Sequence, residues 1–282
     1  MKDFVVSGGH YSTDHKLSKV LNIDNMRSPG RISFGKNGIW AVTDSSKHCV
    51  LLFNDEDQLV KTFGTIGSAN GEFKNPKGVV FDGDDHLYVV DGNNHRVQKF
   101  DTTGNYLLQF GSKSDYGKLN SPTGIAVHND KVYVADSGNS IISVFRLDGK
   151  YCFSFGSEEF AGLLDVTINT DGHVLVSTWS NEGVHKFTLD GQCIGKFGTR
   201  GYYKAPLSYP YSLTTDSNGY TLVAEYYNHR VSVFDKDGAF VSSFGSKGSS
   251  AGQFSYIEGI ALSSDGNIYV SDNGNHRIQV YT

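Results

Sequence analysis

Hydrophobic and polar residues alternate within short segments along most of the chain. Residues 86–91 (HLYVVD), 131–136 (KVYVAD) and 267–272 (NIYVSD) show this two-residue period. Such alternation is typical of strands with one side buried. No segment keeps a 3.6-residue period over ten or more positions, so the pattern predicts an all-β protein.

The strands recur with a period of about 45 residues, which is typical of repeat proteins. A Phe-Gly pair marks each repeat, at residues 63–64, 110–111, 155–156, 197–198 and 244–245. Each repeat contains an apolar strand, a polar turn, an alternating strand, a loop and two more strands joined by a tight turn, often Asp-Gly. Glycine in such turns accepts positive φ and favours hairpins. This order predicts four antiparallel strands per repeat.

Six such units predict a six-bladed β-propeller, in which four-stranded sheets surround an axis. We expect one domain over residues 1–282, with blades that begin near Ser28, Asn75, Ser121, Leu163, Tyr209 and Ser255. The sixth unit ends at Thr282, after its third strand. Residues 4–9 (FVVSGG) resemble the fourth strand of unit five, 240–245 (FVSSFG), so we expect them to pair with the last blade and close the ring. Residues 10–27 would then connect this strand to blade one.

A short motif, Asn-His-Arg, follows the second strand of three units, at residues 94–96, 228–230 and 275–277. It resembles the NHL repeat, and the segments FGTIGSANGEFKNPKG and FGSKGSSAGQFSYIEG resemble the inter-blade segments of TRIM-NHL proteins. This resemblance implies a C-terminal recognition domain of a RING-type ubiquitin ligase. Some members of that group bind RNA through the propeller, and others bind proteins.

The motif itself is expected to be structural, because the same residues recur in three blades. Asp91, Asn94, His95 and Arg96 would tie the loop between the second and third strands of blade two. We call this loop the NHR loop in every blade. Successive loops of an antiparallel sheet alternate between its two ends, so the NHR loops and the inter-blade segments should share one face, the NHR face. The hairpin turns should lie on the opposite face.

Several residues on the predicted NHR face depart from the repeat. Trp179 replaces a glycine in the NHR loop of blade four, and Tyr226 and Tyr227 lie in that of blade five. Aromatic rings beside cations are typical of interaction hot spots, and they also suit unstacked bases with their phosphates. The alternative is that these rings only cover hydrophobic edges between blades. We predict a partner-binding site that comprises Arg31, Lys47, Lys77, Trp179, Arg200, Lys204, Tyr211, Tyr226, Tyr227 and Glu258.

The overall charge favours a protein over RNA as the partner. The formal net charge is -5, which argues against a globally basic nucleic-acid binder but leaves room for a local basic patch. We therefore predict a protein partner or ubiquitination substrate, with RNA as the alternative.

Catalytic motifs are absent from the sequence. It contains no G-x-S-x-G elbow, H-E-x-x-H helix or glycine-rich phosphate loop, and its ten histidines do not form a converging set. We therefore expect no catalysis, metal or cofactor, and a metal-dependent lyase is the least favoured alternative.

The remaining composition suggests a soluble setting. No apolar run approaches the roughly 20 residues that span a bilayer, and the first residues do not resemble a signal peptide. Cys49, Cys152 and Cys193 are an odd and sparse set without the spacing of metal ligands, which suits a reducing, intracellular setting. These features predict a cytoplasmic propeller that is monomeric in isolation and does not bind membranes.

Overall fold

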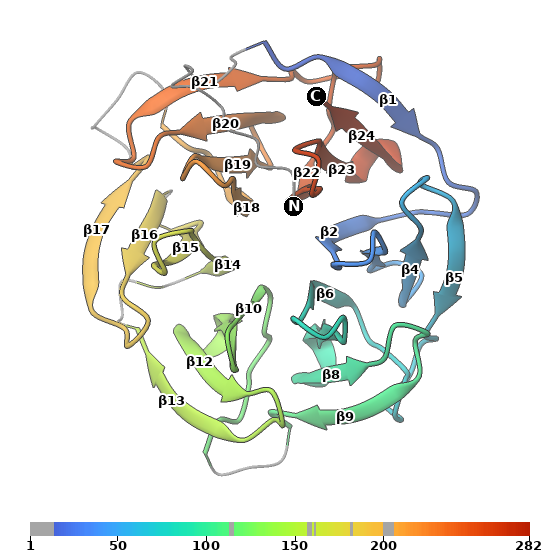
Figure 1. The fold of residues 1–282 in the computed structure, drawn as a ribbon, viewed down its shortest axis with the longest axis vertical. Coiled ribbons are helices and arrows are strands. Elements are labelled where there is room, and N and C mark those ends of the chain that lie inside the picture. The colour runs from blue at the N-terminus through green and yellow to red at the C-terminus, as the bar shows by residue number, and fades with distance from the viewer. Residues whose placement is uncertain (1–13, 113–115, 157–159, 161, 181–182, 200–205) are drawn as a thin grey trace.

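Six four-stranded antiparallel sheets form a ring in the computed structural model (Figure 1). The structure describes residues 14–112, 116–156, 160, 162–180, 183–199 and 206–282. Each sheet is one blade, and its innermost strand faces the axis. The prediction of an all-β, six-bladed propeller is confirmed. Within the described ranges, no helix is long and apolar enough to cross a membrane.

The blades begin within a few residues of the predicted positions. Blade one contains β2 (Pro29–Phe34), β3 (Trp40–Asp44), β4 (Cys49–Phe53) and β5 (Leu59–Phe63). Blade two contains β6 (Pro76–Phe81), β7 (Leu87–Asp91), β8 (Arg96–Phe100) and β9 (Tyr106–Phe110). Blade three contains β10 (Ile125–His128), β11 (Lys131–Asp136), β12 (Ile141–Arg146) and β13 (Tyr151–Phe155). Blades four and five contain β14 (Leu163–Ile168), β15 (Val174–Thr178), β16 (Gly183–Phe187) and β17 (Cys193–Phe197); and β18 (Pro210–Thr215), β19 (Thr221–Glu225), β20 (Arg230–Phe234) and β21 (Phe240–Phe244). Blade six contains β22 (Ile257–Leu262), β23 (Ile268–Asp272), β24 (Arg277–Tyr281) and, as its outermost strand, β1 (Leu17–Leu21).

An N-terminal strand closes the ring, but it is not the predicted one. β1 pairs antiparallel with β24, with Leu17 opposite Tyr281 and Leu21 opposite Ile278. The prediction placed this strand at residues 4–9 and treated 10–27 as a connection. Residues 4–9 lie outside the described residues, and β1 already occupies the free edge of β24. Residues 17–21 form the closing strand because both of its end residues pack on the core. Leu17 packs against the core between blades five and six, and Leu21 packs against the core between blades six and one.

The hydrophobic core lies between neighbouring blades. One cluster, for example, joins Trp40 and Phe53 of blade one to Tyr269 of blade six, with the Trp40 and Phe53 rings stacked at a centroid distance of 4.0 Å. The Phe-Gly pairs end the outermost strands at such interfaces. Phe63 packs on Phe73 and Phe100, and Gly64 (φ 94°) leaves no room for a Cβ, which would lie 2.5 Å from the Phe73 ring.

A buried acidic residue organises the NHR loop in five blades. In blade two, the Asp91 carboxylate accepts hydrogen bonds from Lys74 N (2.7 Å), Asn94 Nδ2 (2.8 Å) and Arg96 Nε (2.7 Å). The corresponding carboxylates are Asp44, Asp136, Glu225 and Asp272. Blade four has Thr178 instead, with its hydroxyl 3.5 Å from His185 Nε2. The Asn and Arg of the motif therefore have the structural role expected of them.

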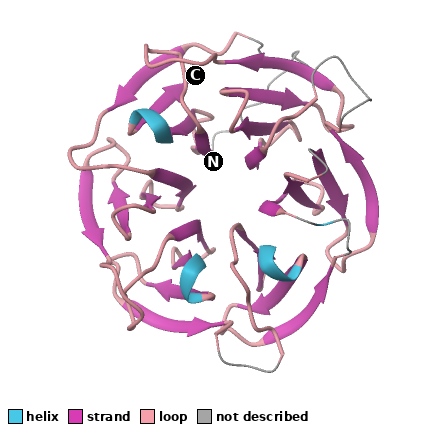
Figure 2. Cartoon of the chain, turned by 180° about the vertical axis from the view of Figure 1, so that it is seen from behind, coloured by secondary structure: helices cyan, strands magenta, loops and turns pink. Residues whose placement is uncertain are grey.

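The motif histidine connects one blade to the next. His95 adopts a left-handed conformation (φ 54°), and its Nδ1 accepts a hydrogen bond from Ser121 N of the following inter-blade segment (2.8 Å). His48 and His229 make the same bond to Asn75 N and Tyr256 N. Short 3₁₀ helices, cyan in Figure 2, form the NHR loops of blades two, three and six, at Gly92–Asn94, Ser137–Asn139 and Asn273–Asn275.

Candidate recognition face

The NHR loops and the inter-blade segments lie on the same face, as the strand order predicts. Trp179 N, in the NHR loop of blade four, donates to Gly162 O at 3.0 Å. In blade five, Tyr226 N donates to Tyr209 O at 3.1 Å. These bonds place Trp179, Tyr209 and Tyr226 on one surface of the propeller.

Aromatic side chains on this face form a connected row across blades four, five and six. The aromatic row comprises Trp179, Tyr209, Tyr211, Tyr226, Tyr227 and Tyr256. Successive ring centroids along Trp179, Tyr209, Tyr211, Tyr226 and Tyr256 are 6.2, 6.1, 5.5 and 4.8 Å apart. The interplanar angles of these successive pairs are at most 32°, while the Tyr209 and Tyr226 rings are tilted by 50° to each other. Tyr227 stands across the row, nearly perpendicular to Tyr226.

The backbone at two of these tyrosines explains how they reach the surface. Tyr209 (φ 53°) and Tyr256 (φ 57°) take the left-handed position that Asn75 and Ser121 occupy in blades two and three. This conformation directs the Tyr256 N–H at His229 Nδ1, at 3.0 Å. Asparagine tolerates it well, whereas a bulky residue there is an outlier that often marks a functional position.

Three members of the row remain well exposed after this packing. The exposed fractions of these residues are 49% for Trp179, 57% for Tyr227 and 39% for Tyr256. The Trp179 indole lies over Gly162, where any Cβ would clash with it. Burial and the nearby Glu258 carboxylate raise the pKa of Tyr226 to about 12, so its phenol is neutral and can donate a hydrogen bond at neutral pH. The row thus offers ring faces and hydroxyl groups to a ligand.

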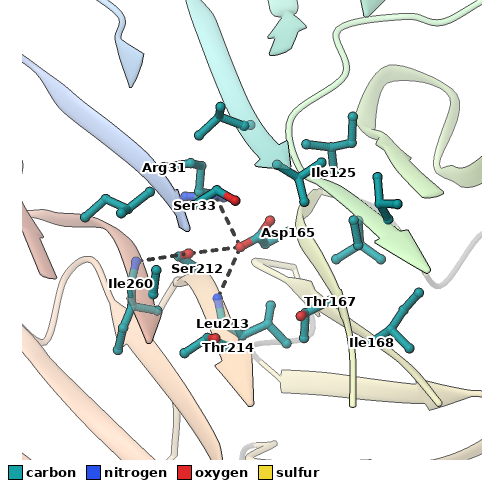
Figure 3. A pocket seen from close by; sticks show the side chains of 18 of the residues that line it. Arg31, Ser33, Ile125, Asp165, Thr167, Ile168, Ser212, Leu213, Thr214 and Ile260 are labelled. Carbon is teal, nitrogen blue, oxygen red and sulfur yellow. Dashed lines mark hydrogen bonds and ion pairs between the residues drawn. The ribbon is translucent and has the colours of Figure 1, made fainter. Parts of the chain in front are cut away.

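Arg31 does not lie on this surface. Its side chain lies in the central channel, where it faces Asp165 (Figure 3). The residue is 7% exposed, and its guanidinium pairs with Asp165 of blade four, with 3.3 Å between Nε and Oδ2. It also donates to the carbonyl oxygens of Leu164 (2.9 Å), Tyr211 and Glu258. The guanidinium carbon stands 4.5 Å from the centroid of the Tyr211 ring. Arg31 therefore joins blade one to blades four, five and six across the axis.

Lys77 and Glu258 lie at the mouth of the channel, below the row. Lys77 Nζ is 3.4 Å from the Tyr211 hydroxyl. Burial lowers the pKa of Lys77 and raises that of Glu258, while the charge of each partly offsets the effect on the other. This half-buried pair supports Tyr211 more than it faces solvent.

The predicted site residues divide into three groups. Trp179, Tyr211, Tyr226 and Tyr227 come together in the row, with Lys77 and Glu258 directly beneath them. Lys47 is exposed but belongs to the NHR loop of blade one, and Arg31 is buried. Arg200 and Lys204 lie outside the described residues. The predicted site omitted Tyr209 and Tyr256, although both occupy the position before the first strand of a blade.

The channel itself contains a cavity of about 240 Å³ below Arg31. Figure 3 shows Asp165 and Ser212 facing Arg31 at this level, with Thr167 and Thr214 farther along the wall. Asp165 Oδ2 is already occupied by Arg31 Nε and by bonds from Ser212 Oγ (2.9 Å) and Leu213 N (3.1 Å). These groups brace the inner strands.

One group of side chains in the described part of the chain has the spacing of metal ligands. Asp82, Asp84 and His86 lie in a hairpin turn of blade two on the opposite face. The Asp82 carboxylate already accepts hydrogen bonds from the backbone N–H groups of Asp84 and His86 and pairs with Lys99. The turn thus explains its geometry without a metal.

Comparison with known proteins identifies the repeat. The sequence pattern of the NHL repeat matches residues 73–100, 119–145 and 254–281, in blades two, three and six. Protein brain tumor of Drosophila melanogaster is 39% identical over 69 residues, which cover 23% of this chain and 6% of that protein. B-box type zinc finger protein ncl-1 of Caenorhabditis elegans is 43% identical over 47 residues, 17% of this chain and 6% of that protein.

Solved structures share the architecture at low sequence identity. A gluconolactonase from Xanthomonas campestris superposes with a TM-score of 0.73 at 14% identity, covering 94% of this chain and 90% of that one. A streptogramin B lyase superposes with a TM-score of 0.69 at 11% identity, covering 94% and 96%. Such likeness shows the fold alone. Together, the six blades, the three repeat matches and the two partial relatives show that this chain is a six-bladed β-propeller that contains NHL repeats in blades two, three and six and resembles the TRIM-NHL proteins in part.

Proposed function

We propose that the NHR face is a non-catalytic recognition surface and that the aromatic row binds a protein partner. The observation that carries this proposal is a connected row of rings across three blades, of which Trp179, Tyr227 and Tyr256 keep large exposed areas. Tyrosine and tryptophan supply most of the binding energy in many protein interfaces. Each combines a large apolar surface with a polar group and has few rotatable bonds.

Covering the edges between blades does not account for the row. A ring that only sealed an edge would be largely buried, yet Tyr227 is 57% exposed. Tyr209 and Tyr256 also adopt a strained left-handed backbone conformation. Blades two and three have smaller residues at this position, Asn75 and Ser121, and asparagine adopts the conformation at lower cost. Both features are consistent with side chains whose partner is another molecule.

The resemblance to the TRIM-NHL proteins suggests the biological setting. We propose that the propeller selects a substrate or partner for a RING-type ubiquitin ligase. The chain spans only a small part of the curated relatives that it matches, 6% of each. Three free cysteines also support a reducing compartment such as the cytoplasm.

Quantitative capture from a cell extract tests the proposal. Wild-type protein is compared with Trp179→Ala/Tyr226→Ala and with Leu107→Ala, which removes an exposed apolar side chain from the outer rim of blade two. We expect the double variant to lose most of the captured protein and the rim variant to retain it. Equal capture by all three proteins would show that the row is not the binding surface.

RNA is the second candidate, and one observation favours it. Exposed cations lie on the NHR face from the segment before blade six to the segment before blade three, namely Lys247, Arg27, Lys47, Lys74 and Lys118. Phosphate contacts from such residues make binding strongly salt-dependent. Titration with a random single-stranded RNA pool would therefore show tight binding at low salt and a steep loss as salt rises. No binding at low salt would exclude this candidate.

A further inference from the structure

Charge is unevenly distributed between the two faces of the propeller. On the opposite face, every hairpin turn contains at least one Asp or Glu, except the first turn of blade one, Gly35–Gly38. Many of these carboxylates cap their own turn, as Asp101 does by accepting from Thr103 N and Asn105 N. Lysine and arginine side chains pair with some of them, among them Asp82, Asp130 and Asp148, and the remaining carboxylates leave this face with an excess of acidic groups.

The NHR face carries the opposite sign over three neighbouring blades. We call Lys247, Arg27, Lys47 and Lys74 the cation arc. They lie in the inter-blade segments before blades six, one and two and in the NHR loop of blade one, and all four are exposed. Two carboxylates share these segments, Asp24 and Glu72, and Glu72 Oε2 accepts a hydrogen bond from Ala69 N.

The cation arc begins where the aromatic row ends. Tyr256, the last ring of the row, packs on His229, with 5.1 Å between the ring centroids. The Lys247 backbone forms a β-bridge with Phe254, two residues before Tyr256, so the lysine lies in the same inter-blade segment as that end of the row. His276 of blade six contacts the Arg27 carbonyl, so the segment that carries Arg27 lies against the NHR loop of blade six.

We propose that the partner presents an extended acidic segment, with prolyl or aromatic residues on the aromatic row and carboxylates on the cation arc. This inference rests on the proposed function and adds the chemical class of the partner. Successive rings from Trp179 to Tyr256 lie within 32° of parallel and form a continuous surface, and the cavity at the adjoining channel mouth is only about 10 Å³, too small for an inserted side chain. Flat residues that stack on ring faces fit such a surface, and the adjacent arc complements negative charge.

The separation of rings and cations favours a peptide over RNA. A single strand places a phosphate beside every stacked base, so a binding groove for it needs cations along the same path as its rings. Here the described exposed cations lie mainly beyond one end of the row. Arg31, which lies directly beneath the row, is buried and bonded to Asp165 and to carbonyl groups.

Two labelled peptides test the inference directly. One repeats Glu-Pro-Tyr, and the other repeats Gln-Pro-Tyr at the same length. Fluorescence anisotropy measures their affinities, and Trp emission reports contact with the row, because Trp179 is exposed while Trp40, the second tryptophan, is buried. We expect the acidic peptide to bind about tenfold more tightly than the neutral peptide and to change the Trp179 emission.

Matched charge reversals locate the acidic end of the peptide. Arg27→Glu/Lys74→Glu should weaken the acidic peptide by about tenfold and leave the neutral one unchanged. Lys150→Glu/Lys236→Glu makes the same change of charge on exposed residues of the opposite face and should have little effect.

The outcomes separate this inference from the proposed function. Equal affinities for the two peptides, both abolished by Trp179→Ala, would overturn the acidic segment but keep the row as a protein-binding surface. No binding of either peptide at about 1 mM would overturn the inference. Binding of a random RNA pool that displaces the acidic peptide and depends on Arg27 and Lys74 would assign this face to RNA and overturn both.

Discussion

A single buried carboxylate fixes the NHR loop in most blades. Asp91 is fully buried and holds the Arg96 guanidinium through a 2.7 Å bond to Nε, so removing its charge leaves that guanidinium without its buried counter-charge, although it still donates to Gln109, Ala69 and Glu72. We expect Asp91→Asn to lower the free energy of unfolding by about 3 kcal/mol. Urea denaturation measures this change. Asp101→Asn, in an exposed hairpin turn, is the control and should cost less than about 1 kcal/mol. Equal effects would contradict the role assigned to Asp91.

Arg31 and Asp165 form a brace across the channel. Replacing the guanidinium by Arg31→Met leaves a buried carboxylate unpaired, and we expect a loss of about 3 kcal/mol at pH 7. Burial already raises the pKa of Asp165, and removing Arg31 should raise it further. A carboxyl group whose pKa is higher in the folded than in the unfolded protein lowers the free energy of unfolding as the pH rises above the unfolded-state pKa of about 3.9.

The loss of unfolding free energy in Arg31→Met, relative to the wild-type protein, should therefore be smaller near pH 4 than at pH 7. Urea denaturation at several pH values measures this loss. Adding Asp165→Asn to Arg31→Met should recover part of the loss at neutral pH. A deficit that is constant with pH would mean that the carboxylate charge is not its cause.

Tyr256 combines a strained backbone conformation with a large exposed area. Replacing it should therefore change partner binding more than it changes the stability of the fold. Tyr256→Asn relieves a left-handed conformation worth about 1 kcal/mol and loses ring contacts of similar size. We expect the free energy of unfolding to change by less than about 1 kcal/mol, while partner capture falls severalfold. Denaturation and capture on the same sample check both parts. Unchanged capture would remove Tyr256 from the binding surface.

Residue patterns predicted part of this face and missed the rest for physical reasons. Trp179, Tyr226 and Tyr227 could be found because they interrupt a repeat at known positions. Tyr209 and Tyr256 share a register, but the sequence does not show that this register turns a side chain outward. Arg31 replaces a glycine like other candidates, yet its contacts are to residues 133 to 227 positions away. Such contacts depend on ring closure and are not visible in local pattern.

Ring closure depends on β1, the first strand of the described chain. Leu21 packs into the core between blades six and one, and the strand covers the free edge of β24. Leu21→Asp should destabilise the propeller by about 2 kcal/mol or more, because it places a charge at a half-buried position against that core and loosens the edge. Val60→Asp, on an exposed position of the outermost strand of blade one, is the matched control and should cost under about 1 kcal/mol.

Thermal and urea denaturation measure both variants, and light scattering reports association through an uncovered β24. A Leu21→Asp protein as stable as Val60→Asp would mean that β1 does not hold the ring closed. The position of this strand was mispredicted because residues 4–9 resemble an outer strand in sequence. Outer strands are exposed, as in β5, or half-buried, as in β21, so their sequences are less constrained than those of inner strands and similarity among them is a poor guide.

At the scale of the whole molecule, the repeat determined what could be predicted. The Phe-Gly period, the number of blades and the sharing of one face by two kinds of loop all follow from alternation and turn residues. The charge difference between the faces follows from the same topology, because the hairpin turns collect carboxylates at one end of every blade. The identity of the partner does not follow from the period, since recognition uses the positions at which the blades differ.

Site-specific photo-crosslinking tests the central claim most directly. A benzophenone amino acid replaces Tyr227 in the aromatic row or, as the control, Leu107 on the outer rim, both of which are exposed. After irradiation in cell extract, protease and ribonuclease treatment shows whether the adduct is protein or RNA. We expect a protease-sensitive, ribonuclease-resistant adduct from position 227 and none of that species from position 107. The same adduct from both positions, or from position 107 alone, would contradict recognition through the aromatic row.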